Sequence, residues 1–322
     1  MKKIFVVILS LLLVLVACGS KQEVKTDSKE EFKIGIVQLI EHPALDDTRQ
    51  GFVDRIKELG IDAKIDYQNA QGDLATARTI SEKFVADKVD LIYAIATPAA
   101  QAAKAATSEI PILFGAITDP VEADLVESNE KPGGNVTGTS DAVNMDEQFE
   151  IFKELDPNIK KIGILYTSDE ANSLSQLKEA EEKAGQHGLE IVSKSITQLS
   201  DLPQLAQAII NQADAFYILT DNKIASSITV LSDLLKENKK ISVSAEESQV
   251  KGGILISKSL SYLDLGAQTA DMAKRILLDG TAVKDIPVER AKKSRSIVNK
   301  KTLEILGLDK DNQVFKDSQE VE

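Results

Sequence analysis

The amino-acid sequence predicts an α/β protein built from two copies of a parallel-sheet domain. Short apolar runs alternate with helical patterns from Phe32 onward, which is typical of βαβ units. The chain has 322 residues, more than a single hydrophobic core usually serves. The phrase KIGI also occurs twice, at 33–36 and at 161–164, each time before an apolar residue and a polar run that starts a helix.

The first copy begins with the apolar run KIGIVQ, whose Ile and Val residues indicate a buried strand. The next segment places Phe52, Ile56 and Leu59 at helical spacing, and Gly60 ends that helix. We expect strands at 33–38, 63–67, 91–96, 112–116 and 135–138, helices at 45–59 and 73–86, and a helix of small residues in AAQAAKAA at 99–106.

The second copy repeats this order. DLIYAIATPAAQAA at 90–103 parallels DAFYILTDNKIASS at 214–227, and GGNVTGTS at 133–140 parallels GGILISKS at 252–259. We expect strands at 161–166, 190–193, 215–219, 241–244 and 253–257, and helices at 172–187, 202–212 and 223–237. A helix from about Tyr262 to Leu278, a strand at 296–298 and a helix at 302–306 form a tail too small for a third domain.

Composition excludes several classes of function. The net charge of −13 argues against nucleic acid, which binds basic surfaces. One cysteine rules out an internal disulfide framework, and two histidines cannot form a histidine-rich metal cluster. The segment GGNVTGTS has the spacing of a phosphate loop, but Thr139 stands where the phosphate-binding lysine belongs. We therefore expect no cofactor and no metal, and catalysis has no positive support.

The N-terminus has the pattern of an export signal. Lys2 and Lys3 precede an apolar run at 4–16 that is short for a membrane span, and small residues surround Cys18. The run Leu-Val-Ala-Cys resembles the lipobox of a bacterial lipoprotein signal. The resemblance implies a signal peptide at 1–17, a lipid on Cys18 and a tether at 18–31. The alternative is an uncleaved anchor helix with a chance cysteine; both place the folded part outside the cytoplasm.

Polar residues follow almost every predicted strand. Ligands of parallel α/β sheets bind outside the carboxyl ends of the strands, so these residues are candidates for a site. For each of them, capping of the next helix is the alternative role. With the prolines that accompany them, they are in chain order Gln38, Glu41, His42, Pro43, Thr97, Pro98, Thr118, Asp119, Pro120, Thr139, Ser140, Asp141, Thr167, Ser168, Asn172, Ser173, Thr220, Asp221, Asn222, Glu246 and Glu247.

This mixture of residues suits an α-amino acid. Helix N-termini with hydroxyls bind an anionic group such as a carboxylate. A carboxylate without a partner, such as Asp221, binds an ammonium group. A sugar is the competing ligand, but the chain has no Trp and only 4% aromatic residues to stack on sugar rings. His42 could also be a capping or core histidine.

Several motifs resemble one known family. They are GIVQLIEHPALD at 35–46, DYQNAQGD at 66–73, AIATPAAQAA at 94–103, ITDPVEADLV at 117–126, KPGGNVTGTSD at 131–141, SDEANS at 168–173 and LTDN at 219–222. The sequence resembles the solute-binding lipoproteins of bacterial ABC importers, in the subfamily associated with tryptophan, tyrosine or phenylalanine uptake. This implies the type I periplasmic-binding-protein fold, with two Rossmann-like lobes joined by three crossovers. Lobe one is expected at 32–140 plus 259–322, and lobe two at 141–258.

The resemblance also implies a ligand site between the lobes. Asp221 is expected to bind the ammonium group, and Ser173, Thr97 and Thr118 the carboxylate. Ser168 departs from the family pattern, so its role is open. The residues carried over are Gln38, His42, Thr97, Pro98, Thr118, Asp119, Asn172, Ser173, Thr220, Asp221 and Asn222.

The function implied is capture of an aromatic or large apolar amino acid by hinge closure, without catalysis. The expected partners are a permease, its separate ATPase subunit and the cell membrane, which the lipid on Cys18 would enter from the extracytoplasmic side. We expect a monomer. The alternatives are a sensory receptor for a sugar or signal molecule, and a lipoprotein enzyme with a carboxylate site. A cytoplasmic repressor core shares the fold, but the lipobox and the missing DNA-binding helices argue against it.

Overall fold

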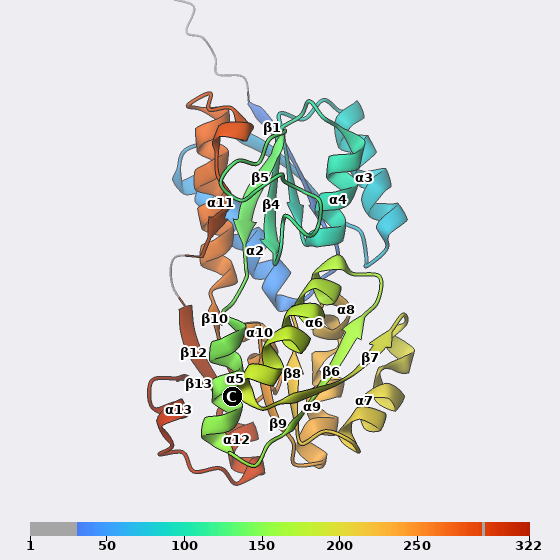
Figure 1. The fold of residues 1–322 in the computed structure, drawn as a ribbon. Coiled ribbons are helices and arrows are strands. Elements are labelled where there is room, and N and C mark those ends of the chain that lie inside the picture. The colour runs from blue at the N-terminus through green and yellow to red at the C-terminus, as the bar shows by residue number, and fades with distance from the viewer. Residues whose placement is uncertain (1–30, 292–293) are drawn as a thin grey trace, which may run out of the picture. The chain divides into compact units, whose positions relative to one another are not determined.

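The computed structural model describes residues 31–291 and 294–322. Lobe one contains a six-stranded sheet in the order β11-β5-β4-β3-β1-β2, in which every paired strand is parallel (Figure 1). The strands are β1 (Phe32–Gln38), β2 (Ala63–Asn69), β3 (Leu91–Ile95), β4 (Ile112–Ile117), β5 (Val136–Ser140) and β11 (Glu289–Arg290). The helices are α2 (Pro43–Glu58), α3 (Leu74–Ala86), α4 (Thr97–Ala106) and α11 (Tyr262–Leu277).

Lobe two contains a seven-stranded sheet in the order β13-β12-β10-β9-β8-β6-β7. The strands are β6 (Lys161–Thr167), β7 (Glu190–Ile196), β8 (Ala215–Ile218), β9 (Ile241–Ser244), β10 (Ile256–Leu260), β12 (Ser294–Asn299) and β13 (Gln319–Val321). The helices are α5 (Met145–Leu155), α6 (Ala171–Ala184), α7 (Leu202–Ile210), α8 (Asn222–Ser226), α9 (Ile228–Glu237), α10 (Glu247–Lys251), α12 (Lys300–Leu306) and α13 (Gln313–Lys316).

Both sheets are buried on two faces, as parallel sheets with helical crossovers must be. In lobe one, Ile34 and Ile36 of β1 are fully buried, which confirms the strand predicted from KIGIVQ. In lobe two, successive residues of β8 enter different apolar clusters: Phe216 packs in one and Tyr217 in the other. Because neighbouring residues of a strand point to opposite faces, these two clusters cover the two sides of the sheet.

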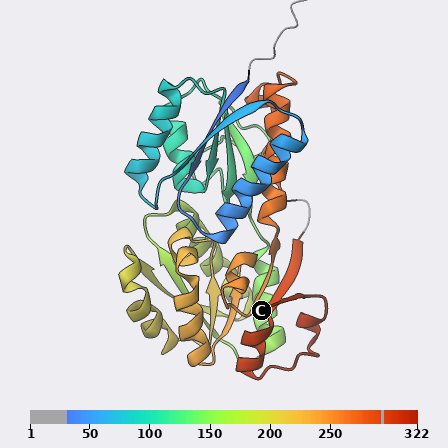
Figure 2. The same ribbon diagram turned by 180° about the vertical axis from the view of Figure 1, so that it is seen from behind.

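Helices α2 and α11 lie against each other in lobe one, although they are far apart in the sequence (Figures 1 and 2). Two glycines allow the contact. A Cβ atom on Gly51 would lie 1.9 Å from the carbonyl oxygen of Leu263, and one on Gly266 would lie 1.9 Å from that of Thr48. No other residue fits at this crossing, which fixes α11 as part of lobe one.

The predicted assignment of the tail is wrong in part. Helix α11 and strand β11 do belong to lobe one, where β11 pairs with β5. Residues 294–322 instead extend the sheet of lobe two: β12 pairs antiparallel with β10, and β13 pairs with β12. The pairing satisfies the outer edge of β10 and buries Ile297 and Val298. A chain that starts in lobe one and crosses three times must indeed end in lobe two.

Smaller differences concern helix boundaries in lobe two. The helix predicted at 223–237 is two helices, α8 and α9, separated at Ser227. The strand predicted at 253–257 begins later, at Ile256, and includes residues 259 and 260. Helix α5 was not predicted, although Asn144 caps it and Phe149 and Phe152 lie on its buried face.

The predicted signal peptide (1–17), Cys18 and nearly all of the tether lie outside the described residues. Within residues 31–291 and 294–322, no helix has both the length and the apolar character needed to cross a membrane. The same part of the chain contains no group of three or more His, Cys, Asp or Glu side chains placed to hold a metal ion.

Candidate functional site

Residues at the carboxyl ends of the strands form hydrogen bonds between the two lobes. The Nε2 atom of His42, which follows β1, lies 3.3 Å from Oδ1 of Asn222, which follows β8. The hydroxyls of Thr118 and Thr220 lie 2.8 Å apart. Gln176 of α6 donates to the Thr118 hydroxyl at 3.4 Å. The structure thus brings together predicted site residues from both copies of the repeat.

Two residues near these strand ends have a left-handed backbone. Ala96 directly follows β3 with φ 79°, and Ala116 in β4 has φ 58° beside a break in register with β5. Residues with a side chain rarely adopt such angles, and strain of this kind clusters at functional sites. Each of them comes just before a predicted site residue: Thr97 directly follows Ala96, and Thr118, two residues after Ala116, contacts Thr220 of lobe two.

Helix α4 presents an uncapped N-terminus at this boundary. No side chain caps its first N–H groups, and Pro98 occupies the first turn. The hydroxyl of Thr97 is buried and has no hydrogen-bond partner among the described residues. A helix N-terminus with a buried hydroxyl offers donors and a positive dipole end to an anion.

His42 is buried as a neutral side chain. Burial lowers its pKa to about 4, against a smaller rise from its hydrogen bond to Asn222. Since Asn222 Oδ1 is an acceptor, we assign the proton to Nε2 of His42, which leaves Nδ1 as an acceptor. That Nδ1 has no hydrogen-bond partner among the described residues, and it lies 4.0 Å from Oε1 of Glu246.

Two buried carboxyl groups in this region, Glu246 beside the imidazole and Asp141, have no basic partner among the described residues. Glu246 follows β9 and is 2% exposed; burial, with a smaller contribution from the charge of Asp141, raises its pKa to about 8. Asp141 follows β5, and its Oδ2 accepts a hydrogen bond of 2.9 Å from the Tyr262 hydroxyl. Its Oδ1 has no partner in the described part of the chain. Neither carboxyl group pairs with a lysine or arginine of residues 31–291 and 294–322.

Asp221 differs from these two groups because all its acceptor positions are used. Its Oδ1 accepts from the Thr167 hydroxyl at 2.7 Å and the Ile224 N–H at 3.0 Å. Its Oδ2 accepts from the Thr167 N–H at 2.6 Å and the Ser173 hydroxyl at 2.7 Å. Asp221 is fully buried. It therefore has no acceptor left for an ammonium group, contrary to the prediction, and Ser173 is likewise occupied.

Glu170 forms several hydrogen bonds within the part of lobe two that faces lobe one. It accepts from the side chain of Asn172 at 3.1 Å and from the backbone N–H groups of Asn222 and Lys223 at 3.1 and 3.2 Å. Burial raises its pKa to about 7, and the charge of Asp221 adds to the shift. Asn172 also donates to the Thr220 carbonyl at 2.8 Å, while its own Oδ1 is buried without a partner among the described residues.

The other predicted residues support the site from within their own lobes. The Gln38 amide donates to the Ile40 carbonyl and to Asp46, and its oxygen accepts from Arg49. Asp119 accepts from the N–H groups two and three residues after it and so caps a turn. The Gln38 side chain is therefore occupied, whereas Oδ2 of Asp119 is not used by these bonds.

Glu246 and Asp141 are among the predicted strand-end residues but not among those carried over from the family resemblance, and Glu170 and Gln176 are in neither set. Asp221 accepts four hydrogen bonds, whereas Glu246 and Asp141 each accept one from another side chain. This difference depends on how the folded segments meet and is not visible in the sequence.

Two cavities flank these residues between the lobes. The first, of about 310 Å³, is lined by Leu39, Ile40, Leu74 and Pro98 of lobe one and by Asp169 and Lys223 of lobe two. The second, of about 620 Å³, is lined mainly by polar groups, among them Thr118, Asp119, Gln176, Glu179 and Lys183.

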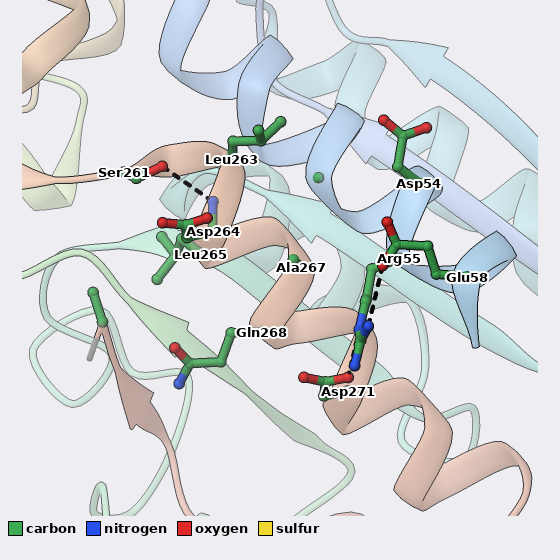
Figure 3. A pocket seen from close by; sticks show the side chains of 12 residues that line it. Asp54, Arg55, Glu58, Ser261, Leu263, Asp264, Leu265, Ala267, Gln268 and Asp271 are labelled. Atoms are coloured by element: carbon green, nitrogen blue, oxygen red, sulfur yellow. Dashed lines mark hydrogen bonds and ion pairs between the residues drawn. The ribbon is translucent and has the colours of Figure 1, made fainter. Parts of the chain in front are cut away.

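A third hollow, of about 580 Å³, lies in lobe one beside the crossing of α2 and α11 (Figure 3). Its one arginine is already paired: Arg55 donates to Asp271 at 2.9 Å and to Glu58 at 3.1 Å. Since it is away from the strand ends and has no unpaired buried polar atom, we do not assign it a ligand.

Comparison with known proteins shows the same architecture elsewhere. A family model described as ABC transporter substrate binding protein matches residues 33–322. A protein from Clostridioides difficile (strain R20291) named tyrosine-binding protein is 43% identical over 296 residues, which cover 91% of this chain and 86% of that protein.

Two solved structures are informative together. An ABC domain in complex with L-Trp from Streptococcus pneumonia is 35% identical with a TM-score of 0.86, covering 91% of this chain and all of that one (100%). A ligand-free, open substrate binding protein with adhesive properties from Clostridium difficile is 42% identical but has a TM-score of 0.70, covering 90% and 99%. The less identical complex matches better, which agrees with the hydrogen bonds that join the lobes here.

Proposed function

This chain belongs to the ABC transporter substrate binding protein family, and we propose that it captures an α-amino acid with an aromatic or large apolar side chain between its two lobes. Family membership makes it a binding protein and not an enzyme. The relatives that are named for tyrosine or contain L-Trp support the choice of ligand.

The observation that carries this proposal is a set of buried acceptors with too few donors. Among the described residues His42 Nδ1 and Asp141 Oδ1 have no donor, and Glu246, 4.0 Å from His42 Nδ1, has only the Ser248 hydroxyl. A buried charge is stable only when paired. An ammonium group brings three N–H donors and one positive charge, so it satisfies this set. Glu246 and Asp141 thus take the role that the sequence had assigned to Asp221.

The carboxylate of the ligand would lie at the N-terminus of α4. The Thr97 hydroxyl and the uncapped N–H groups of the first turn supply donors there, as predicted for Thr97. The Thr118 hydroxyl, also predicted, is bonded to Thr220 and so contributes to joining the lobes.

Binding would be coupled to closure of the hinge. His42 belongs to lobe one and Glu246 to lobe two, so an ammonium group contacts both only when the lobes meet. Asp141 and Tyr262 lie at the first and second crossovers, and their hydrogen bond links the ligand site to the hinge. A ligand that binds the closed form more tightly shifts the population toward it.

The steps after binding would involve a permease, an ATPase subunit and the cell membrane. The closed protein would dock on a permease whose separate ATPase subunit supplies energy, and opening would release the amino acid. A lipid on Cys18 would hold the protein, as a monomer, at the outer face of the cell membrane, since acyl chains provide an anchor without a spanning helix.

A ligand screen tests the proposal. Aromatic amino acids should raise the melting temperature, because a ligand that binds only the native state stabilises it. The twenty amino acids and a set of sugars are compared by thermal shift, and hits are confirmed by calorimetry. If a sugar stabilises the protein while all amino acids leave the melting temperature unchanged, the proposal is wrong.

The stability of the ligand-free protein should depend on pH through Glu246. Its pKa is raised from 4.5 to about 8, so its contribution to stability is complete below the unfolded value and is lost as the pH rises through 8. We expect a lower free energy of unfolding at about pH 8.5 than at about pH 6.5, by on the order of 1–2 kcal/mol. His42, whose pKa is lowered from 6.5 to about 4, changes stability mainly below pH 6.5 and adds only a small change of opposite sign in this window.

Urea unfolding at the two pH values measures this difference. Asp141 has a raised pKa as well, so the contribution of Glu246 is isolated by comparison with Glu246→Gln, in which the pH dependence should be smaller. An identical pH dependence in both proteins would show that Glu246 is not the group responsible.

A further inference from the structure

The cavity of about 310 Å³ beside the site combines a wall from lobe one that is apolar except for Asp73, the N-cap of α3, with a charged wall from lobe two. We propose that it receives the side chain of the amino acid, and that Asp169 selects an aromatic ring carrying a hydrogen-bond donor, such as a phenol hydroxyl or an indole N–H. This inference rests on the proposed function and adds a specificity-determining residue to it.

The cavity adjoins both ends of the amino-acid site. Pro98, in its wall, directly follows Thr97, the donor assigned to the carboxylate. Asn222, also in its wall, is the residue that fixes the His42 imidazole. An α-amino acid held by these two neighbours therefore has its side chain next to the cavity.

The apolar wall is held in place by the loop after β2. The N–H of Ala70 donates to the Gln38 carbonyl at 2.8 Å, and that of Gly72 donates to the Leu39 carbonyl at 2.7 Å. Gly72 has φ 78°, and a Cβ atom there would lie 3.3 Å from Cδ1 of Ile40. A side chain at Gly72 would therefore crowd Ile40, so the glycine of the QNAQGD segment helps to keep this wall in shape.

In the charged wall, the Asp169 carboxylate has acceptor positions that no described residue uses. Lys223 Nζ donates to both oxygens of Asp169 at 2.8 Å and to the Thr197 carbonyl at 3.2 Å, so its three N–H groups are used. The Asp169 carboxylate accepts only these two bonds among the described residues, whereas a carboxylate has about four acceptor positions. In this wall the donors of Lys223 are all used, whereas acceptor positions of Asp169 remain free. A ring that bears a hydroxyl or an N–H therefore suits it better than a plain phenyl ring.

Calorimetry with L-tyrosine, L-tryptophan and L-phenylalanine tests this directly. The wild-type protein should bind the first two roughly tenfold more tightly than phenylalanine, as expected for one hydrogen bond to a charged acceptor. Asp169→Ala should abolish this preference and leave the affinity for phenylalanine unchanged. Asp233→Ala is the matched control, because Asp233 is an exposed aspartate in an ion pair with Lys236 in a different part of lobe two.

A second variant tests the position of the ring. Ile40→Trp should fill the cavity and weaken binding of all three aromatic amino acids while affinity for L-alanine is kept; circular dichroism checks that it folds. The inference is overturned if wild type binds phenylalanine as tightly as tyrosine, or if Asp169→Ala keeps the preference. Failure of the proposed function looks different, because then no amino acid binds the wild-type protein.

Discussion

Replacement of Glu246 by glutamine is expected to weaken binding of the amino acid by about 2–5 kcal/mol, the usual cost of removing one partner from a buried charge pair. Glu246 is 2% exposed and has no basic partner in the described part of the chain. Glutamine has the same size and can still accept the hydrogen bond from Ser248, so the change removes mainly the negative charge. The affinity should be measured by calorimetry at neutral pH.

The control for this experiment is a ligand without an ammonium group. Desaminotyrosine, which keeps the ring and the carboxylate, should bind wild type weakly and should lose no further affinity in Glu246→Gln. The variant itself should be at least as stable as wild type without ligand, because it removes a buried carboxyl group that lacks a partner. Equal affinity of wild type and variant for the amino acid would remove Glu246 from the site.

The fold was largely predictable because its signals are local. The repeated KIGI strands, the alternation with helices and the capping residues each depend on a few neighbouring positions. The tail was not predictable in the same way, because β12 is a short apolar run that could extend either sheet. Its pairing with β10 depends on which sheet has an open apolar edge, which is a property of the assembled lobes.

The sequence predicted where the site lies better than it predicted which residue has which role in it. The strand-end rule led to His42, Thr118 and Asn222, which form hydrogen bonds between the lobes, and to Thr97, whose hydroxyl is buried without a partner among the described residues; their roles in binding stay predictions. The same rule cannot separate Asp221 from Glu246, since both follow strands of lobe two. Thr167 and Ser173, which saturate Asp221, are distant in sequence, and so is Asp141, which raises the pKa of Glu246.

Asp221→Ala is expected to destabilise the ligand-free protein by about 3–5 kcal/mol. The substitution leaves two hydroxyls and two backbone N–H groups of lobe two without their acceptor, and buried unsatisfied donors carry a large desolvation penalty. It also removes the cap of α8, which starts the segment carrying Asn222. Urea unfolding followed by circular dichroism measures the change.

Asp214→Ala is the matched control for this prediction. Asp214 also accepts two backbone N–H groups next to β6, from Lys160 at 2.9 Å and Lys161 at 2.8 Å, but it is exposed. Water can replace its carboxylate, so the loss should be about 1 kcal/mol. Where Asp221→Ala is still folded, its affinity for the amino acid should change far less than that of Glu246→Gln. The opposite result, normal stability with lost binding, would mean that Asp221 itself holds the ammonium group.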